Sequence, residues 1–252
     1  MGTERFKIKE KEKKELRKLL YGLAFKNRAS HVGPSLSCLD IIYEVYQAYN
    51  LDDVKLILSK GHGVMALYTV LHHMGVISDE EWATIFQAGS KFIGHVPNLP
   101  SHFMEVPTGS LGHGLSVACG IAFAKPTTDV VCILGDGETN EGSIWEAFAF
   151  AAKYNHGNLK IIVDWNGVQG FDKCEHLFNN PTEDYNLRDK VEGFGLFTVF
   201  CHSSQIQDLL IQDGRSGPPT VFFVQSEKSL ESHYSKMTLY QYQKHMVELD
   251  ES

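Results

Sequence analysis

The feature that most constrains the fold is the stretch of residues 129–170, which predicts a strand, a helix and a second strand with a polar turn after each strand. The first strand is the apolar run 130–134, and it stops at Gly135-Asp136-Gly137, where two glycines let the backbone turn sharply. The second strand, 161–163, ends just before Asn166. Both turns of a parallel βαβ unit lie at the carboxyl end of the sheet. We therefore expect Asp136 and Asn166 to lie close together although thirty positions separate them.

The two polar turns predict a site for a divalent cation. A carboxylate, an amide oxygen and nearby backbone carbonyls are hard oxygen ligands that suit magnesium or calcium. Magnesium held by so few protein ligands usually completes its coordination with water and the oxygens of a bound phosphate. The alternative is that Asp136 only caps the helix and that Asn166 occupies an ordinary turn. The matched positions of the two residues at strand ends favour a metal-bridged diphosphate site.

Length and composition indicate the class of protein. A chain of 252 residues with 43% hydrophobic residues is long enough for one large α/β domain, which we expect to span residues 1–252. A net charge of −8 argues against a general nucleic-acid binder. No apolar stretch reaches roughly 18 residues, and the charged N-terminus lacks the apolar core of a signal peptide. Five scattered cysteines without CxxC spacing predict buried thiols in a reducing cytoplasm.

The rest of the chain alternates helical and strand patterns. Helical patterns cover residues 4–26, 38–49, 64–74, 115–124 and 204–213, and strand patterns cover 54–58, 195–200 and 220–225. Ser78 and Glu81 have the spacing of a capping box at the start of a short helix. The segment 88–108 is rich in Gly, Pro and His and predicts a long loop, which is more often functional than accidental.

Several of these segments resemble the transketolase family. Gly-Asp-Gly followed by Asn is similar to the thiamine diphosphate motif, and three other segments carry the resemblance further. They are Ala29-Ser30-His31-Val32-Gly33-Pro34-Ser35-Leu36-Ser37, Ser59-Lys60-Gly61-His62-Gly63 and Thr108-Gly109-Ser110-Leu111-Gly112-His113-Gly114. The resemblance implies a thiamin diphosphate-binding fold of the PP-domain type, an α/β three-layer sandwich with a mostly parallel sheet.

The resemblance also implies roles for individual residues. Asp136, Asn166 and the backbone carbonyl of Val168 would bind magnesium, for which calcium can substitute. The cofactor would meet His62, Gly109, Ser110, Leu111, Gly137, Glu141 and Asn166. Three histidines would assist catalysis, namely His31, His95 and the late His233. The run around His233 has lost the family's glycines and is shorter, which leaves the substrate range open.

The implied activity belongs to one half of an enzyme. The chain resembles only the diphosphate-binding half, which implies the N-terminal subunit of a split, cytoplasmic transketolase. Such a protein would transfer a two-carbon ketol unit from a ketose to an aldehyde only with a separate pyrimidine-binding subunit, in a self-associated α2β2 assembly.

Four alternatives stand beside this interpretation. The α subunit of a 2-oxo acid dehydrogenase also has the GDG…N motif but lacks the His31 and His62 segments. Half of a deoxyxylulose phosphate synthase is a second possibility, although that family is normally one chain. The altered C-terminal run keeps a non-catalytic scaffold relative open as a third alternative, although an intact set of Asp136, Asn166 and His62 would be unusual in such a protein. A nucleotide-binding Rossmann protein is excluded because no GxGxxG opens the first βαβ unit.

Overall fold

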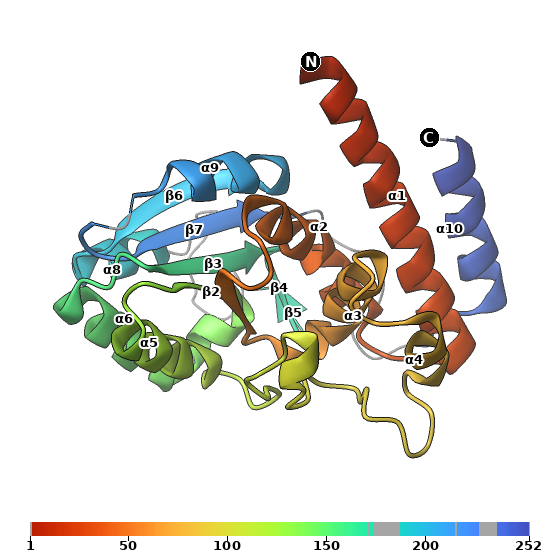
Figure 1. Cartoon of the computed structure of the whole chain (residues 1–252), viewed down its shortest axis with the longest axis horizontal. Helices are drawn as coiled ribbons and strands as arrows, with labels where there is room; N and C mark the ends of the chain where they lie inside the picture. Colours follow the sequence, from red (N-terminus) through yellow and green to blue (C-terminus); the bar gives the residue numbers. More distant parts are fainter. Residues whose placement is uncertain (1, 171, 174–186, 215, 227–235, 252) are drawn as a thin grey trace.

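A five-stranded sheet runs through the computed structural model, which describes residues 2–170, 172–173, 187–214, 216–226 and 236–251 (Figure 1). Every pair of neighbouring strands in it is parallel. In spatial order the strands are β1 (Val54–Leu58), β2 (Asp129–Gly135), β3 (Leu159–Trp165), β7 (Thr220–Gln225) and β6 (Phe197–His202). A separate antiparallel pair joins β4 (Val168–Gln169) to β5 (Asp172–Lys173). The parallel sheet confirms the predicted α/β class.

The central strands are apolar because both faces of the sheet are covered. Successive side chains of a strand point to opposite faces, so a strand buried on both sides is hydrophobic at every position. On β2, Val131 and Ile133 lie in one hydrophobic cluster, whereas Val130, Cys132 and Leu134 lie in the other. All five side chains are fully buried. The two clusters are the two interfaces of a three-layer sandwich, as predicted.

Helices form the outer layers. One layer contains α1 (Gly2–Asn27), α2 (Val32–Ala48), α3 (Val64–His73) and α9 (Ile206–Gln212). The other contains α5 (Gly114–Ala124), α6 (Gly142–Tyr154) and α8 (Leu187–Gly193). The short helix α4 (Asp79–Thr84) follows α3, and 3-10 turns occupy η1 (Gly61–Gly63), η2 (Pro100–His102), η3 (Gly137–Asn140) and η4 (Ser203–Gln205). The last helix, α10 (Leu239–Glu251), runs beside α1 in Figure 1.

Most of the predicted helices and strands are present, and the predictions differ from the structure mainly in where an element begins or ends. The helix predicted over 38–49 begins at Val32, because Gly33 and Pro34 lie in its first turn, where proline's missing N–H loses no helical hydrogen bond. The strand predicted over 195–200 lies two residues further on, as β6. The capping box of α4 is confirmed, since Ser78 and Glu81 bond each other's backbone amides. The helix α10 was not predicted.

The cysteines and helices also agree with two simple expectations. Cys38, Cys119, Cys132 and Cys201 are buried free thiols, and Cys174 lies outside the described residues. Within the described part of the chain, no helix is both long and apolar enough to cross a membrane.

A buried ion network fastens α1 to the body of the protein. Glu44 of α2 is completely buried, and its two carboxylate oxygens lie 2.7 Å from Lys9 Nζ and 2.8 Å from Lys13 Nζ. Lys13 is itself only 5% exposed. Lys9 also donates to Gln207 Oε1 of α9, so the network joins three helices. Burying these charges is tolerable only because each has a partner.

Removing the shared carboxylate should therefore destabilise the fold. We expect Glu44→Ala to lower the free energy of unfolding by about 3 kcal/mol, because it leaves the buried Lys13 ammonium without its counter-ion. Urea unfolding measures the change. The matched control is Glu15→Ala, which breaks only the exposed Lys11–Glu15 pair on α1 and should change stability by about 0.5 kcal/mol or less. Equal losses in the two variants would contradict the prediction.

Candidate functional site

Three polar turns meet at the carboxyl end of the sheet. Residues 59–62 follow β1, Asp136 and Gly137 follow β2, and residues 166–168 follow β3. The strands are neighbours in the order β1-β2-β3, so the turns that follow them are neighbours too. Parallel α/β sheets bind their ligands at this end.

Asp136 joins the second and third turns. Its side chain is buried, and Oδ2 accepts hydrogen bonds from the backbone N–H groups of Asn166 at 3.1 Å and Gly167 at 2.6 Å. Oδ1 accepts from Gly137 N at 2.7 Å, so Asp136 also caps the turn η3. The predicted meeting of Asp136 and Asn166 is confirmed. Burial, followed by the nearby charge of Asp164, raises the pKa of Asp136 to about 7.

The neighbourhood of Asp136 suits a divalent cation. The Asp136 carboxylate accepts from the backbone N–H of Asn166, the residue that carries the candidate amide ligand. Burial is the largest cause of the raised pKa of Asp136, and a bound cation would stabilise its ionised form. The Asn166 side-chain oxygen accepts from Val168 N at 2.9 Å, so these two predicted ligands are ordered against each other. No cluster of three or more His, Cys, Asp or Glu that could hold a metal occurs among the described residues. The expected magnesium set needs only one carboxylate, and it fits.

Position 137 must be glycine because Gln169, a residue that the sequence did not single out, packs closely against it. A Cβ atom at Gly137 would lie 2.4 Å from Cβ of Gln169, so only glycine allows Gln169 to approach. Gln169 is held in turn by Asn140, whose Nδ2 donates to Gln169 Oε1 at 2.7 Å. The resemblance implies that the diphosphate meets Gly137, and in the structure the side chain of Gln169, on β4, lies close against the same glycine.

A buried ion pair lies next to Asp136, whose backbone N–H donates to the carbonyl oxygen of Asp164 at 3.3 Å. Lys60, in the turn after β1, donates to the fully buried Asp164 at the end of β3. Ser37 of α2 donates to the same carboxylate at 2.6 Å, and Ser226 after β7 donates to its other oxygen. Burial lowers the pKa of Lys60, but the Asp164 carboxylate, with smaller contributions from Cys38 and Asp136, more than offsets this and raises the pKa above its usual value. The sequence analysis did not predict this ion pair. The signal that could have shown it is a lysine just after an apolar strand.

Glu138 is a second buried carboxylate that the sequence analysis missed. Its Oε1 accepts from Ser59 Oγ at 2.5 Å and from Gly112 N at 2.9 Å, while Oε2 accepts from Gly135 N at 3.1 Å. One side chain thus connects the turn after β1, the turn before α5 and the end of β2. Burial raises the pKa of Glu138, and these hydrogen bonds oppose the shift.

Three of the predicted histidines gather beside these turns. The ring centroid of His31 lies 5.8 Å from that of His62 and 5.9 Å from that of His95. His31 and His62 line a cavity of about 220 Å³ together with Arg28, Ser30 and Phe86. Burial, with a smaller effect of His95, lowers the pKa of His31. His31 has a left-handed backbone (φ 63°), which directs the chain into α2 from an uncommon conformation.

The remaining predicted site residues differ in their burial and in their contacts. Gly109 lies against His95, since a Cβ there would be 3.2 Å from the His95 ring. Leu111 is half-buried, whereas Ser110 and Glu141 are exposed and their side chains form no hydrogen bond within the part of the chain that the structure describes. Glu141 stands where α6 begins, beside Gly112, whose φ of +83° also requires glycine. His233 lies outside the described residues.

The fold and the site together define a parallel α/β protein whose polar turns meet at the carboxyl ends of its strands. Comparison with known proteins gives the family. Residues 16–204 match the family model of the transketolase thiamine diphosphate binding domain. The chain therefore belongs to the transketolase family.

Individual relatives differ in how much of their length is matched. One of the subunits of the apulose-4-phosphate transketolase of Phocaeicola vulgatus is 33% identical over 207 residues, which are 77% of this chain and 72% of that one. Human transketolase-like protein 2 is 37% identical over 172 residues, but the match covers only 27% of its length. The crystal structure of Campylobacter jejuni transketolase superimposes on 96% of this chain and 42% of its own with a TM-score of 0.81, at 24% identity. That likeness confirms the fold.

The role of Glu138 can be tested by an almost isosteric change. Glu138→Gln turns an amide NH2 toward one or more of the three donors, so we expect the free energy of unfolding to fall by about 2 kcal/mol. Denaturant unfolding measures it. Glu146→Gln, on the exposed side of α6, is the control and should stay within about 0.5 kcal/mol of the parent. A Glu138→Gln protein as stable as the control would show that Glu138 does not hold the turns.

Proposed function

We propose that this chain is the diphosphate-binding N-terminal subunit of a split transketolase. Residues 1–252 would form one thiamine diphosphate-binding domain, and magnesium would bridge that domain to the cofactor. The activity would be transfer of a two-carbon ketol unit from a ketose donor to an aldehyde acceptor. It would require a separate pyrimidine-binding subunit.

The observation that carries this proposal is the junction of two groups of residues at one end of the sheet. Asp136 and Asn166, which meet in the structure, would provide hard oxygen ligands, and the cluster of His31, His62 and His95 would provide groups that can exchange protons near neutral pH. His62 comes two residues after Lys60, whose ammonium binds Asp164, a neighbour of Asp136. The metal-binding candidates and the histidines are therefore parts of one structure.

Each residue would have a defined task. Asp136, Asn166 and the Val168 carbonyl would hold the metal, and His62, at the turn η1 before α3, would hydrogen-bond the diphosphate. Bound thiamine diphosphate supplies a thiazolium ring that accepts the electron pair left when a C–C bond breaks. His31 and His95 would bind hydroxyl oxygens of the ketose and move protons there. The lowered pKa of His31 keeps its imidazole neutral near pH 7, so that it can accept a proton.

Other predicted contacts remain part of the proposal. Gly109, Ser110, Leu111, Gly137 and Glu141 would line the cofactor, and His233 would contact the diphosphate and the substrate. The matched length of the apulose-4-phosphate transketolase subunit supports a separate chain for the second half of the site. The buried free thiols of the described cysteines support a reducing, cytoplasmic setting.

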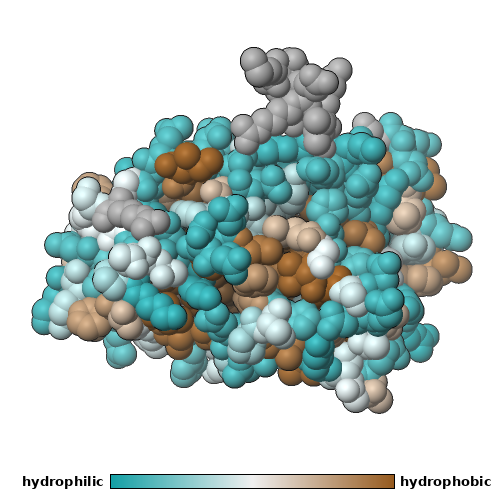
Figure 2. All heavy atoms as spheres, viewed as in Figure 1, coloured by the Kyte–Doolittle hydropathy of each residue, from teal (hydrophilic) through white to brown (hydrophobic). Residues whose placement is uncertain are grey.

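An apolar surface on α5 and α6 supports the expected self-association into an α2β2 assembly. Val117, Phe123, Phe150 and Tyr154 are each between 38% and 55% exposed, and the ring centroids of Phe123 and Tyr154 lie 5.6 Å apart. Figure 2 shows hydrophobic atoms among the polar ones in the lower left part, where Figure 1 places these helices. A contiguous exposed apolar patch of this kind is typical of a protein–protein contact.

The two-subunit requirement gives a direct test. Purified alone, the chain should show no ketol transfer, because the residues that contact the pyrimidine end of the cofactor would be on another chain. Adding the candidate pyrimidine-binding subunit, with thiamine diphosphate and magnesium, should restore turnover of ketose donors with a series of aldehydes. Full turnover by the isolated chain would refute the split-subunit proposal. Failure of every ketose donor in the reconstituted complex would refute ketol transfer itself.

The metal assignment has its own test. We expect Asp136→Ala to abolish magnesium-dependent binding of thiamine diphosphate, measured by titration calorimetry on the complex with its partner. Losing the carboxylate removes a metal ligand and also the acceptor for Asn166 N and Gly167 N. Asp208→Ala, on the exposed side of α9, is the control and should bind as the parent does. Unchanged cofactor affinity in Asp136→Ala would contradict the assignment.

A further inference from the structure

Two side chains outside the predicted site, Tyr68 and Glu81, hold the loop that carries His95; we call them its anchors. His95 lies in the long segment between α4 and α5, which contains one short 3-10 turn, and its side chain is exposed. A side chain on such a segment is not positioned by a helix or a strand. Catalytic groups must nevertheless be held to within about an ångström of their working position. Other side chains must therefore fix this loop.

Tyr68 of α3 anchors the loop at its backbone. Its side chain is completely buried, and its hydroxyl donates to the carbonyl oxygen of Ile93 at 2.9 Å. The same hydroxyl lies 3.5 Å from the carbonyl oxygen of His95 itself. The Tyr68 ring packs edge-on against the buried Phe92, with ring centroids 5.4 Å apart. The hydroxyl thus ties the backbone on both sides of the Ile93–His95 segment to a rigid helix.

Glu81 of α4 anchors the loop on both sides of His95. One carboxylate oxygen lies 2.7 Å from Lys91 Nζ and 3.0 Å from His102 Nε2. Lys91 precedes His95 by four residues, and His102 follows it by seven. Hydrogen bonds from Lys91 above all, and from His102 with a smaller effect, lower the pKa of Glu81 to about 2. The Glu81 carboxylate therefore stays ionised at neutral pH and remains an acceptor for both neighbours.

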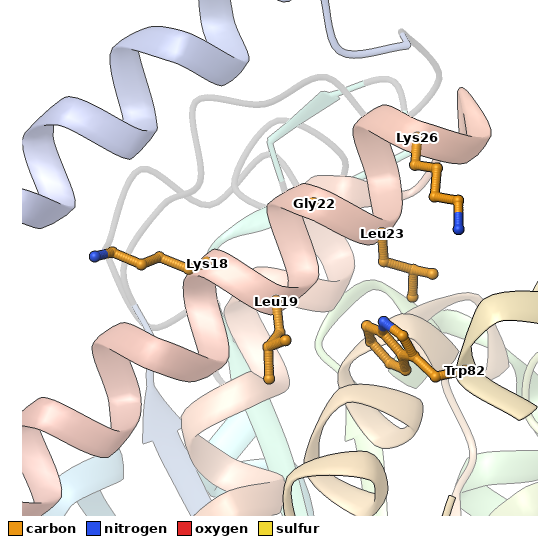
Figure 3. Close-up of a pocket in the computed structure, with 6 residues that line it drawn as sticks. All are labelled: Lys18, Leu19, Gly22, Leu23, Lys26 and Trp82. Atoms are coloured by element: carbon orange, nitrogen blue, oxygen red, sulfur yellow. The ribbon is translucent and has the colours of Figure 1, made fainter. Parts of the chain in front are cut away.

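The helix that carries Glu81 is itself fixed to the core layer. Trp82, the next residue, stacks on His72 of α3 with ring centroids 4.3 Å apart. Figure 3 shows Trp82 below Leu23 of α1, across a cavity of about 220 Å³. Glu81 also completes the capping box with Ser78. The two anchors, Tyr68 and Glu81, therefore belong to elements that are packed independently of the loop.

We propose that Tyr68 and Glu81 are positioning residues that hold His95 for the reaction. The anchors fix the loop at Ile93 and at both flanks, so that the His95 ring lies against Gly109 and faces His31. Each of the two residues acts through the loop on His95 rather than on the substrate. This inference depends on the role of His95 in the proposed function.

Two conservative variants test the anchors, each with a matched control. Tyr68→Phe removes one hydroxyl, and Tyr43→Phe is its control, because Tyr43 is equally buried and its hydroxyl donates to Glu12 instead. Glu81→Gln keeps an acceptor for the capping box but loses the charge, and the exposed Glu80→Gln on the same helix is its control. Hydrogen exchange of the full chain should accelerate in residues 91–104 for Tyr68→Phe and Glu81→Gln, and for neither control.

The decisive measurement is a double-mutant cycle with His95→Ala in the reconstituted two-subunit complex. We expect Tyr68→Phe and Glu81→Gln each to lower kcat/KM for the ketose donor by about tenfold, with the affinity for thiamine diphosphate unchanged. In the His95→Ala background each should lower it by less than about twofold, because the residue through which they act is gone. A purely structural role would produce equal losses in both backgrounds.

The outcomes separate this inference from the proposed function. If His95→Ala strongly lowers donor turnover while Tyr68→Phe and Glu81→Gln leave it at the parent level, the anchors do not position His95 and the function stands. Equal losses with and without His95 overturn the inference in the same way. If His95→Ala itself turns over donor at the parent rate, the role proposed for His95 fails, and the positioning role fails with it.

Discussion

The buried ion pair between Lys60 and Asp164 is the interaction on which the rest of the site depends. Asp164 lies near the end of β3, and its carboxylate accepts hydrogen bonds from segments that follow β1 and β7 and from α2. A fully buried carboxylate is tolerated only when both of its oxygens have partners. When the sheet forms and buries Asp164, these three segments must therefore come together around it. Burial, and after it the charge of Asp164, raises the pKa of Asp136. Two carboxylates sharing one lysine leave this end of the sheet short of positive charge, which a divalent cation would supply.

Glu138 is a second buried carboxylate that draws hydrogen-bond donors from several segments, here from the turns near the histidines. Its carboxylate joins Ser59, Gly112 and Gly135, and the close approach of these turns explains why glycines are placed there. A Cβ at Gly61 would lie 2.8 Å from the backbone nitrogen of Gly109, and one at Gly114 would lie 2.4 Å from Ser59 Oγ. The polar turns are therefore packed as closely as a hydrophobic core. Buried hydrogen bonds to two acidic residues keep them in register with the strands.

The sequence predicted the elements whose patterns are local and missed those that depend on contacts across the fold. The strands β2 and β3 were identified because apolar runs end in glycine and polar turns. The start of α2 was misplaced because Gly33 and Pro34 usually signal a turn, although Pro34 fits the first turn of a helix. The helix α10 was missed because α1 stabilises it, with Tyr242 and His245 stacked on Phe25 and Tyr21. Such stacking has no periodic signature in the sequence.

The sequence by itself determined the α/β class, the turns that carry Asp136, Asn166 and the three histidines, and the family resemblance, because these follow from short patterns and fixed spacing. Only the tertiary structure decided which side chains hold those turns in place. Lys60, Asp164 and Glu138 look like ordinary charged residues in the sequence, and Tyr68 and Glu81 look like ordinary helix residues. Their roles arise because distant segments bring hydrogen-bond donors to buried carboxylates and loop carbonyls to a buried hydroxyl. Charge and hydroxyl groups acquire such partners only when the layers of the fold are packed together.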